Sequence, residues 1–130
     1  MADLVSVVIP CRNDPRLARA LASVAAQTYS VKELIIVDDA STPPLAPPRL
    51  PAAGVLVRFD RQLGPAAARN AGVEAATGEW VAFLDADDWW LPSKLTRQMA
   101  RLQDTGRDWS YTDCYYDPPP GRLRPNSFFH

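Results

Sequence analysis

Four short apolar runs, rich in valine and isoleucine, constrain the fold of this 130-residue chain more than any other feature. They cover residues 4–9, 34–37, 55–59 and 80–84. Each run is continuous rather than alternating, which is typical of strands that are buried on both faces of a parallel sheet. The sequence therefore predicts a parallel sheet with helices on both of its sides.

Helical patterns lie between these runs. We predict a first helix that is capped by Asp14, has Pro15 at its first position and continues to about residue 25. A second helix, rich in alanine, is predicted from Pro65 to Ala76 and closed by Gly78. Strands that alternate with helices indicate an α/β protein with an open, mainly parallel sheet flanked by helices.

The remaining connections are predicted from turn residues and spacing. A third helix is expected from Pro92 to Gly106, since apolar residues between them recur at helical spacing. We expect a fifth strand at about residues 109–115. The connection between the second and third strands holds five prolines between residues 43 and 51, so it has little room for a helix.

Composition narrows the class of protein. Apolar residues make up 47% of the chain and charged residues 22%, which is ordinary for a soluble globular protein, and the length fits a single domain over residues 1–130. A formal net charge of -1 gives no electrostatic footprint for nucleic acid, so we expect no nucleic-acid partner. No stretch approaches the ~20 apolar residues of a transmembrane segment, and the N-terminus lacks the basic region of a signal peptide. These features predict a cytoplasmic protein.

Polar residues follow three of the predicted strands at the point where each strand ends. They occupy residues 10–13, 38–41 and 85–88. In an open α/β sheet, ligands bind just beyond the carboxyl ends of the strands. We therefore expect the three clusters to converge on one edge of the sheet and to form the functional site.

The acidic cluster after the fourth strand carries the most information. Asp85, Asp87 and Asp88 place three carboxylates within four residues, and these would repel one another if they were buried without a cation. Mg²⁺ or Mn²⁺ resolves this repulsion with one or two carboxylates plus phosphate oxygens and waters. The alternative from the cluster alone is a solvated acidic turn that precedes the third helix.

Two further candidates lie elsewhere on the predicted edge. Asp38 and Asp39 follow the second strand, where an acidic residue binds ribose in dinucleotide-binding folds, although Asp and Ser are also common in plain turns. Arg69, early in the second helix, is placed to reach a phosphate or to hold Asp39, unless it is only a surface arginine. Neither Gly-x-Gly-x-x-Gly nor a Walker loop is present, so a nucleotide site here depends on carboxylates and metal.

Four segments taken together resemble family 2 glycosyltransferases with the GT-A fold. They are residues 5–10 (VSVVIP), 38–41 (DDAS), 64–72 (GPAAARNAG) and 78–88 (GEWVAFLDADD). The segments occur in the family's order and spacing, and the resemblance extends to about Cys114. It implies an enzyme that transfers a sugar from a nucleoside diphosphate sugar to an acceptor hydroxyl. The donor that it implies first is a UDP-sugar, and the transfer would invert the configuration at the anomeric carbon.

The resemblance also implies site residues. Pro10 and Arg12 would line the nucleobase pocket, Asp39 would bind the base or ribose, and Asp85 would contact ribose or the donor sugar. The full set of nucleotide-sugar-binding residues that we predict is Pro10, Arg12, Asn13, Asp38, Asp39, Arg69, Asp85 and Asp87. Asp87 and Asp88 are the predicted ligands of a Mn²⁺ or Mg²⁺ cofactor in this DXD-type motif.

The acceptor side is expected to be largely missing from the chain. In the family a carboxylate beyond the metal motif acts as the general base, and none of the later acids sits in a motif that matches it; these acids are Asp104, Asp108, Asp113 and Asp117. The catalytic residue and the acceptor, whether sugar, lipid or protein, stay unassigned, and a longer parent protein is compatible with a place at the membrane surface. Two alternatives remain: a nucleotide-sugar-binding module without transfer activity, and a sugar-phosphate nucleotidyltransferase. The second alternative lacks the glycine-rich, basic loop that it needs after the first strand.

Overall fold

The computed structural model describes residues 3–46, 53–112, 114–116 and 124–125. The chain divides into two compact units, Met1–Thr96 and Arg97–His130, and each is described by itself. In the described residues, no helix is both long enough and apolar enough to span a membrane.

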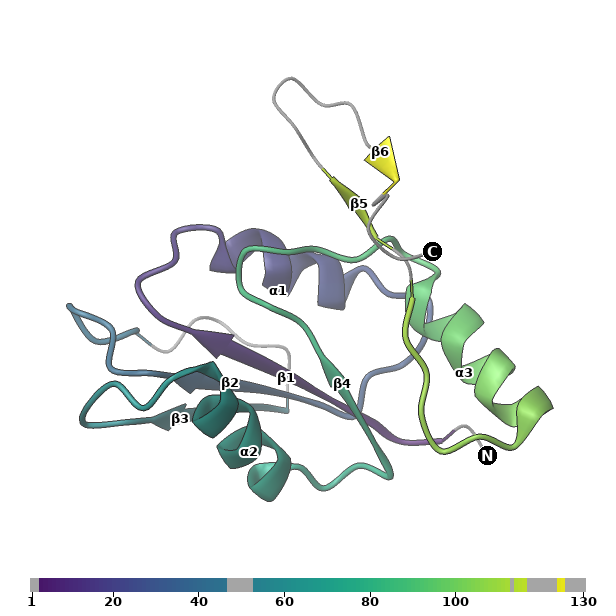
Figure 1. Ribbon diagram of the computed structural model, residues 1–130, viewed down its shortest axis with the longest axis horizontal. Helices are drawn as coiled ribbons and strands as arrows, with labels where there is room; N and C mark the ends of the chain where they lie inside the picture. Colours follow the sequence, from purple (N-terminus) through teal and green to yellow (C-terminus); the bar gives the residue numbers. More distant parts are fainter. Residues whose placement is uncertain (1–2, 47–52, 113, 117–123, 126–130) are drawn as a thin grey trace. The chain divides into compact units, whose positions relative to one another are not determined.

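The first unit is built on one parallel sheet of four strands (Figure 1). The strands are β1 (Val5–Cys11), β2 (Glu33–Asp38), β3 (Gly54–Arg58) and β4 (Trp80–Phe83), in the order β3-β2-β1-β4. Every neighbouring pair is parallel. The four predicted strands and the open α/β fold are therefore confirmed.

Two helices cover the sheet, one on each side (Figure 1). The helix α1 (Leu17–Ala25) joins β1 to β2, and α2 (Pro65–Ala75) joins β3 to β4. The first crossover moves along the sheet in one direction and the second moves back past β1. Because both crossovers are expected to be right-handed, this reversal places their helices on opposite faces.

The face under α2 is packed very closely. Val8, Ile35 and Val37 form a buried cluster with Ala68 of α2. One turn further along the helix, a Cβ added to Gly72 would lie 2.2 Å from Cγ1 of Val8. A glycine is therefore required at this position for α2 to lie against β1.

The start of α1 differs slightly from the prediction. The helix begins at Leu17 rather than at Pro15, after a turn over residues 15 and 16. Asp14 is therefore not the N-cap as predicted: Arg16 occupies that position without a side-chain cap, and Asp14 Oδ1 accepts a hydrogen bond of 2.9 Å from the backbone N–H of Arg16 within the preceding turn. The second helix begins at Pro65 as predicted, after Gly64 with a φ of 95°.

The sequence predicts that Gly78 closes the second helix, but it does not. The helix ends at Ala75, and Gly78 instead packs on the first strand, where its N–H donates to Ser6 Oγ (2.8 Å). An added Cβ would lie 2.6 Å from that oxygen and 2.9 Å from the carbonyl oxygen of Leu4. The proline-rich connection contains no helix in the residues that the structure describes between β2 and β3.

The predicted fifth strand is wrong. Residues 109–112 form no strand, and β5 is restricted to Tyr115–Tyr116, which pairs antiparallel with β6 (Arg124–Pro125). These two strands form a small sheet of their own within the second unit.

The third predicted helix is confirmed as α3 (Lys94–Thr105), although it begins at Lys94, after a turn over residues 92 and 93, rather than at Pro92. It contains the boundary between the two units. Its apolar stripe is buried, as the spacing predicted; the stripe consists of Leu95, Met99 and Leu102. Gly106 follows the last turn with a φ of 63°, and its N–H donates to the carbonyl of Leu102 (2.9 Å).

Candidate active site

The chain changes direction across the sheet between β1 and β4, and ligands bind at such a switch point. From β1 the chain proceeds to β2 on one side, whereas β4 lies on the other side of β1. Cys11 at the end of β1 is in register with Asp38, and Asp85 lies just past the end of β4. The three polar clusters therefore meet at one edge of the sheet, as predicted.

The carboxylates after β4 form a compact group on what we call the acidic loop, residues 84–93. Asp85, Asp87 and Asp88 each offer an oxygen, and these oxygens all lie within 4.8 Å of one another. A turn brings them together, in which the N–H of Asp88 donates to the carbonyl of Asp85 (3.0 Å). The side chains of Asp85 and Asp87 are each 48% exposed, so a dissolved cation has access to them.

The negative charges of these three carboxylates repel one another. Partial burial raises the pKa of Asp88, and the neighbouring negative charges of Asp87 and Asp85 raise it further. Arg16 and Arg19 act in the opposite direction. A bound cation would relieve the repulsion among the three carboxylates, and the hard oxygen donors suit Mg²⁺ or Mn²⁺.

Arg69 of α2 pairs with the first carboxylate of the acidic loop. Its Nη2 lies 2.8 Å from Oδ1 of Asp85, and 38% of the Arg69 side chain is exposed. We had considered Asp39 as its partner, and the structure does not show this contact. Arg69 therefore fastens α2 to the acidic loop instead of to the loop after β2.

Asp39 is held by backbone groups instead. Its Oδ1 accepts a hydrogen bond from the N–H of Leu63 (2.7 Å), and its Oδ2 accepts one from the N–H of Gly64 (3.0 Å). Asp39 is 5% exposed. The carboxylate therefore ties the end of β2 to the start of α2, and each oxygen keeps lone-pair capacity for a second hydrogen bond.

Asp38 departs from its expected role as a ligand of the nucleotide sugar. Its side chain is fully buried, its Oδ1 accepts from the N–H of Ser41 (3.0 Å), and its Oδ2 accepts from the N–H of Leu45 (3.0 Å) and from Arg58 Nη1 (3.0 Å). Burial alone would raise the pKa of Asp38, but these hydrogen bonds and the charge of Arg58 hold it below its ordinary value. The Asp38 side chain therefore stabilises the loop after β2, and none of its surface is accessible to a ligand.

The loop after β1 is joined to the loop after β2 by Asn13. Its N–H donates to Ser41 Oγ (3.0 Å), and its Oδ1 accepts from the N–H of Thr42 (2.8 Å). Asn13 has a φ of 50°, a conformation that asparagine tolerates better than most residues. Nearby, Pro10 is half-buried at the end of β1 and Arg12 is exposed.

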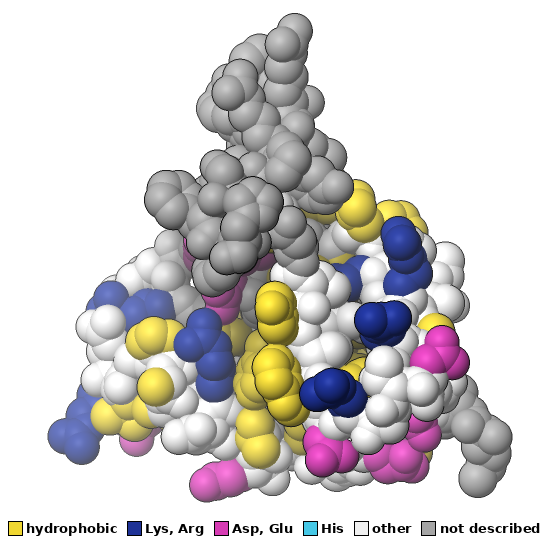
Figure 2. All heavy atoms as spheres, turned by 45° about the vertical axis from the view of Figure 1, so that its right-hand side comes forward, with side chains coloured by type: hydrophobic (Ala, Val, Ile, Leu, Met, Phe, Trp, Pro, Cys, Tyr) yellow, Lys and Arg dark blue, Asp and Glu magenta, His cyan; other side chains and the backbone are white. Residues whose placement is uncertain are grey.

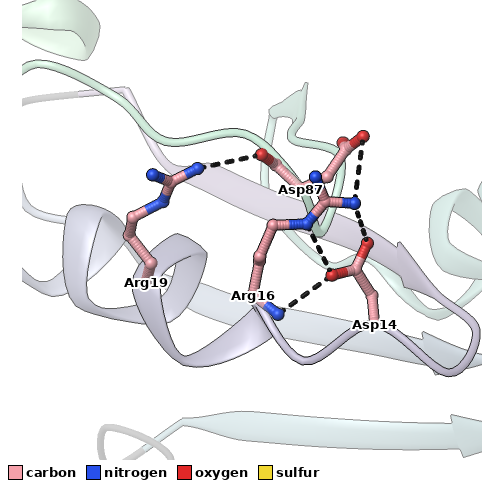
Figure 3. A network of polar contacts seen from close by, with 4 residues as sticks. All are labelled: Asp14, Arg16, Arg19 and Asp87. Carbon is pink, nitrogen blue, oxygen red and sulfur yellow. Dashed lines mark hydrogen bonds and ion pairs between the residues drawn. The ribbon is translucent and has the colours of Figure 1, made fainter. Parts of the chain in front are cut away.

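Two arginines at the start of α1, which the sequence analysis did not single out, contact the acidic loop (Figure 3). Arg16 Nη2 lies 3.8 Å from Oδ2 of Asp87, and Arg19 Nη2 donates to the backbone carbonyl of Asp87 (3.2 Å). Arg16 also pairs with Asp14, whose pKa is lowered by that contact. The signal for finding them was their i, i+3 spacing, which places both on one face of the first turn.

The two tryptophans that follow the acidic cluster differ in burial. Trp90 is 7% exposed and packs in the interior, with Lys94 Nζ 4.9 Å from its ring centroid. Trp89 is half-buried. The structure thus assigns Trp90 a packing role.

Basic and acidic side chains are both spread over the face that Figure 2 views.

The class of protein is defined by the four-stranded parallel sheet, its helices on both faces and the acidic cluster at the switch point. The chain is an open α/β domain with the GT-A fold, as the sequence predicted.

Comparisons with known proteins specify the family. Residues 6–128 match the family described as glycosyl transferase family 2. The succinoglycan biosynthesis protein ExoO of Rhizobium meliloti is 39% identical over 108 residues, which are 80% of this chain and 31% of that protein. An uncharacterized glycosyltransferase of Nostoc sp. is 45% identical over 104 residues, which are 72% of this chain and 31% of that protein. The chain belongs to glycosyl transferase family 2.

Solved structures share the fold. S. aureus TarS, solved in complex with UDP-GlcNAc, matches 80% of this chain with a TM-score of 0.69 and 26% identity, over 32% of that chain. A mannosyltransferase of Pyrobaculum calidifontis, solved with GDP-Man and Mn²⁺, matches 75% of this chain with a TM-score of 0.64 and 29% identity, over 32% of that chain. The match thus covers about a third of each of these solved chains, of which the first is TarS residues 1–349.

Proposed function

We propose that this chain binds a nucleoside diphosphate sugar together with Mn²⁺ or Mg²⁺ and contributes the donor site of an inverting glycosyltransferase. The observation that carries the proposal is the group of three carboxylates within 4.8 Å of one another at the switch point of the sheet. Family membership supports sugar transfer. The Mn²⁺ and GDP-Man in the mannosyltransferase, and the UDP-GlcNAc in TarS, support the cofactor and the kind of donor.

The carboxylates fit a divalent cation by their chemistry. Asp87 and Asp88 are exposed and would hold it, while Asp85 is paired with Arg69 and would contact the donor. When bound, the cation supplies Lewis-acid stabilisation of the charge that develops on the leaving nucleoside diphosphate. We leave Asp38 out of the ligand set because its side chain is fully buried and its oxygens are already engaged.

The remaining site residues would bind and orient the nucleoside. Asp39 has acceptor capacity left for a donor N–H or O–H of the base or ribose. Pro10 and Arg12 lie at the end of β1 and would line the base, and Asn13 holds the two adjoining loops together. UDP is the first nucleotide to test because the resemblance implies a UDP-sugar.

Asp87→Ala tests the proposal directly. Calorimetry should show that the wild-type chain binds UDP in the presence of Mn²⁺ and that Asp87→Ala loses this manganese-dependent binding, since it removes a ligand that carries one charge of the site. Arg97→Ala, on the exposed surface of α3, is the control and should bind as wild type does. Unchanged UDP affinity in Asp87→Ala would sink the metal assignment.

A nucleotide-sugar-binding module without transfer activity is the second candidate, because none of the acids after the start of α3 lies in a motif that matches the general base of the family. Transfer requires a general base to take the proton of the acceptor hydroxyl. Among the described residues after the start of α3, the acids are Asp104 and Asp108, both exposed, whereas Asp113 and Asp117 lie outside the described residues. Incubation with UDP-GlcNAc and Mn²⁺ separates the two candidates: release of UDP indicates turnover, and binding without release indicates a module.

A further inference from the structure

The acidic loop is fastened to α1 near residue 87 and to the residues just after α1 at its far end. At its front end, Arg19 Nη2 donates a hydrogen bond of 3.2 Å to the backbone carbonyl of Asp87 (Figure 3). This contact acts on the main chain between the two carboxylates that we propose as metal ligands. Because the acceptor is a backbone oxygen, this contact fixes the course of the loop main chain.

At its far end, the acidic loop is held by Gln27, just past the end of α1. Gln27 Nε2 donates to the backbone carbonyls of Leu91 (2.8 Å) and Ser23 (3.2 Å), while its Oε1 accepts from the N–H of Leu95 (3.0 Å). One side chain thus satisfies three backbone groups, including one at the first turn of α3.

The residue after Gln27 extends this attachment. The N–H of Thr28 donates to the carbonyl of Pro92 (2.9 Å), and its Oγ1 lies 2.7 Å from Oγ1 of Thr96. The acidic loop is therefore attached to α1 near residue 87 and to the two residues 27 and 28 beyond α1 at residues 91 and 92. A loop with both ends held in this way has little freedom to move its carboxylates apart.

We propose that Arg19 and Gln27 are positioning residues for the cation, which hold the acidic loop in the shape that receives it and touch neither cation nor donor. The inference rests on the proposed function, since it requires Asp87 and Asp88 to bind Mn²⁺. Residues that orient metal ligands from outside typically account for 10–100-fold of metal affinity. The hydrogen bonds of Arg19 and Gln27 to the loop main chain give them that position.

Arg16 provides an internal contrast because it carries the same charge near the same carboxylate. It pairs at 3.8 Å with the side chain of Asp87, and 57% of the Arg16 side chain is exposed. Through-space repulsion alone predicts that removing either arginine strengthens cation binding. Positioning predicts the opposite sign for Arg19 only, because Arg19 holds the loop main chain.

The test measures the Mn²⁺ dissociation constant at a fixed concentration of UDP, by calorimetry. Arg19→Ala and Gln27→Glu should each weaken Mn²⁺ binding about tenfold, the latter even though it adds a negative charge. Arg19→Lys, which keeps one charged donor, should recover most of the affinity. Arg16→Ala should bind Mn²⁺ as tightly as wild type or more tightly, and Arg97→Ala should be unchanged.

Thermal melts without metal show whether each variant is folded at the temperature of the titration. They therefore distinguish a loss of Mn²⁺ affinity from a loss of folding. Mn²⁺ binding by Arg19→Ala and Gln27→Glu at wild-type affinity, while Asp87→Ala binds none, overturns the inference and leaves the proposed function standing. A wild-type chain that binds no Mn²⁺ overturns both. Equal weakening by Arg16→Ala and Arg19→Ala also overturns the inference, because the attachment of the main chain would then have no separate effect.

Discussion

Gly72→Ala is expected to destabilise the protein, although alanine is the better helix former. In a helix interior the exchange normally gains about 1 kcal/mol. Here the new Cβ would lie 2.2 Å from Cγ1 and 3.0 Å from Cγ2 of Val8, so a rotation about the stiff χ1 of valine does not remove the clash. Ordinary carbon contacts are about 3.5–4.0 Å, so α2 must move away from the sheet by more than 1 Å.

The size of the effect follows from two opposing terms. Overpacking a close-packed core costs about 1–3 kcal/mol, and the severe overlap with Val8 places this site at the upper end. After the gain in helix propensity, about 2 kcal/mol of net destabilisation remains. Urea unfolding monitored by circular dichroism measures it, with Val73→Ala on the exposed side of the same helix as the control, expected within about 0.5 kcal/mol of wild type.

A double-mutant cycle identifies the cause. Val8→Ala alone removes two buried methyl groups and should cost about 2 kcal/mol. In Val8→Ala/Gly72→Ala the new Cβ enters the space left by the valine, so the double variant should be about as stable as Val8→Ala. Additive losses, or a Gly72→Ala variant at least as stable as wild type, would refute the reasoning.

Two further predictions follow from the residues around the site. Asp38→Asn should cost about 3 kcal/mol at pH 7, because the new amide presents donors to the N–H of Leu45 and to Arg58. Since the folded-state pKa of Asp38 lies below its unfolded value, its stabilisation is present above the unfolded pKa of about 3.9 and is lost as pH falls through the folded pKa. Urea unfolding from pH 7 to pH 3 should show the gap between wild type and variant narrowing, and a constant gap would contradict this. Arg69→Ala should weaken UDP binding about tenfold while the requirement for Mn²⁺ persists, because it frees Asp85 but removes no proposed metal ligand; loss of the Mn²⁺ requirement would contradict it.

The sheet could be predicted because its strands carry their own signal. A strand that is buried on both faces must be apolar throughout, and in the middle of this sheet every residue from Leu34 to Val37 is at most 2% exposed. The failed fifth strand shows the limit of that signal. Trp109 and Tyr111 have high strand propensity, yet in this structure they stack on each other at 6.0 Å in an exposed stretch, because a strand also needs a partner.

The site could be predicted at the level of strand ends but not of individual side chains. Asp38 and Asp39 are adjacent in sequence and looked equivalent. Asp38 is the last residue of β2 and Asp39 follows it, and successive residues along an extended chain point to opposite sides. Asp38 therefore enters the interior to meet Arg58, and Asp39 meets the start of α2. Which acid Arg69 reaches depends on how closely α2 approaches the sheet, and Gly72 sets that distance through a contact that no local pattern encodes.

The charges around the acidic loop are compatible with the proposed cation and with a diphosphate next to it. Among the described residues, the printed contacts join four carboxylates (Asp14, Asp85, Asp87 and Asp88) and three guanidinium groups (Arg16, Arg19 and Arg69) there. The carboxylates exceed the guanidinium groups by one negative charge, which the exposed setting tolerates. A divalent cation reverses this balance to one positive charge, which favours a diphosphate next to it. On this count the cation and the nucleotide each improve the site for the other, and by the reciprocity of linked binding the factor is the same in both directions. Among these described groups, the three arginines would thus do more than neutralise the acids: they would bring the local charge to the value at which one divalent cation changes its sign.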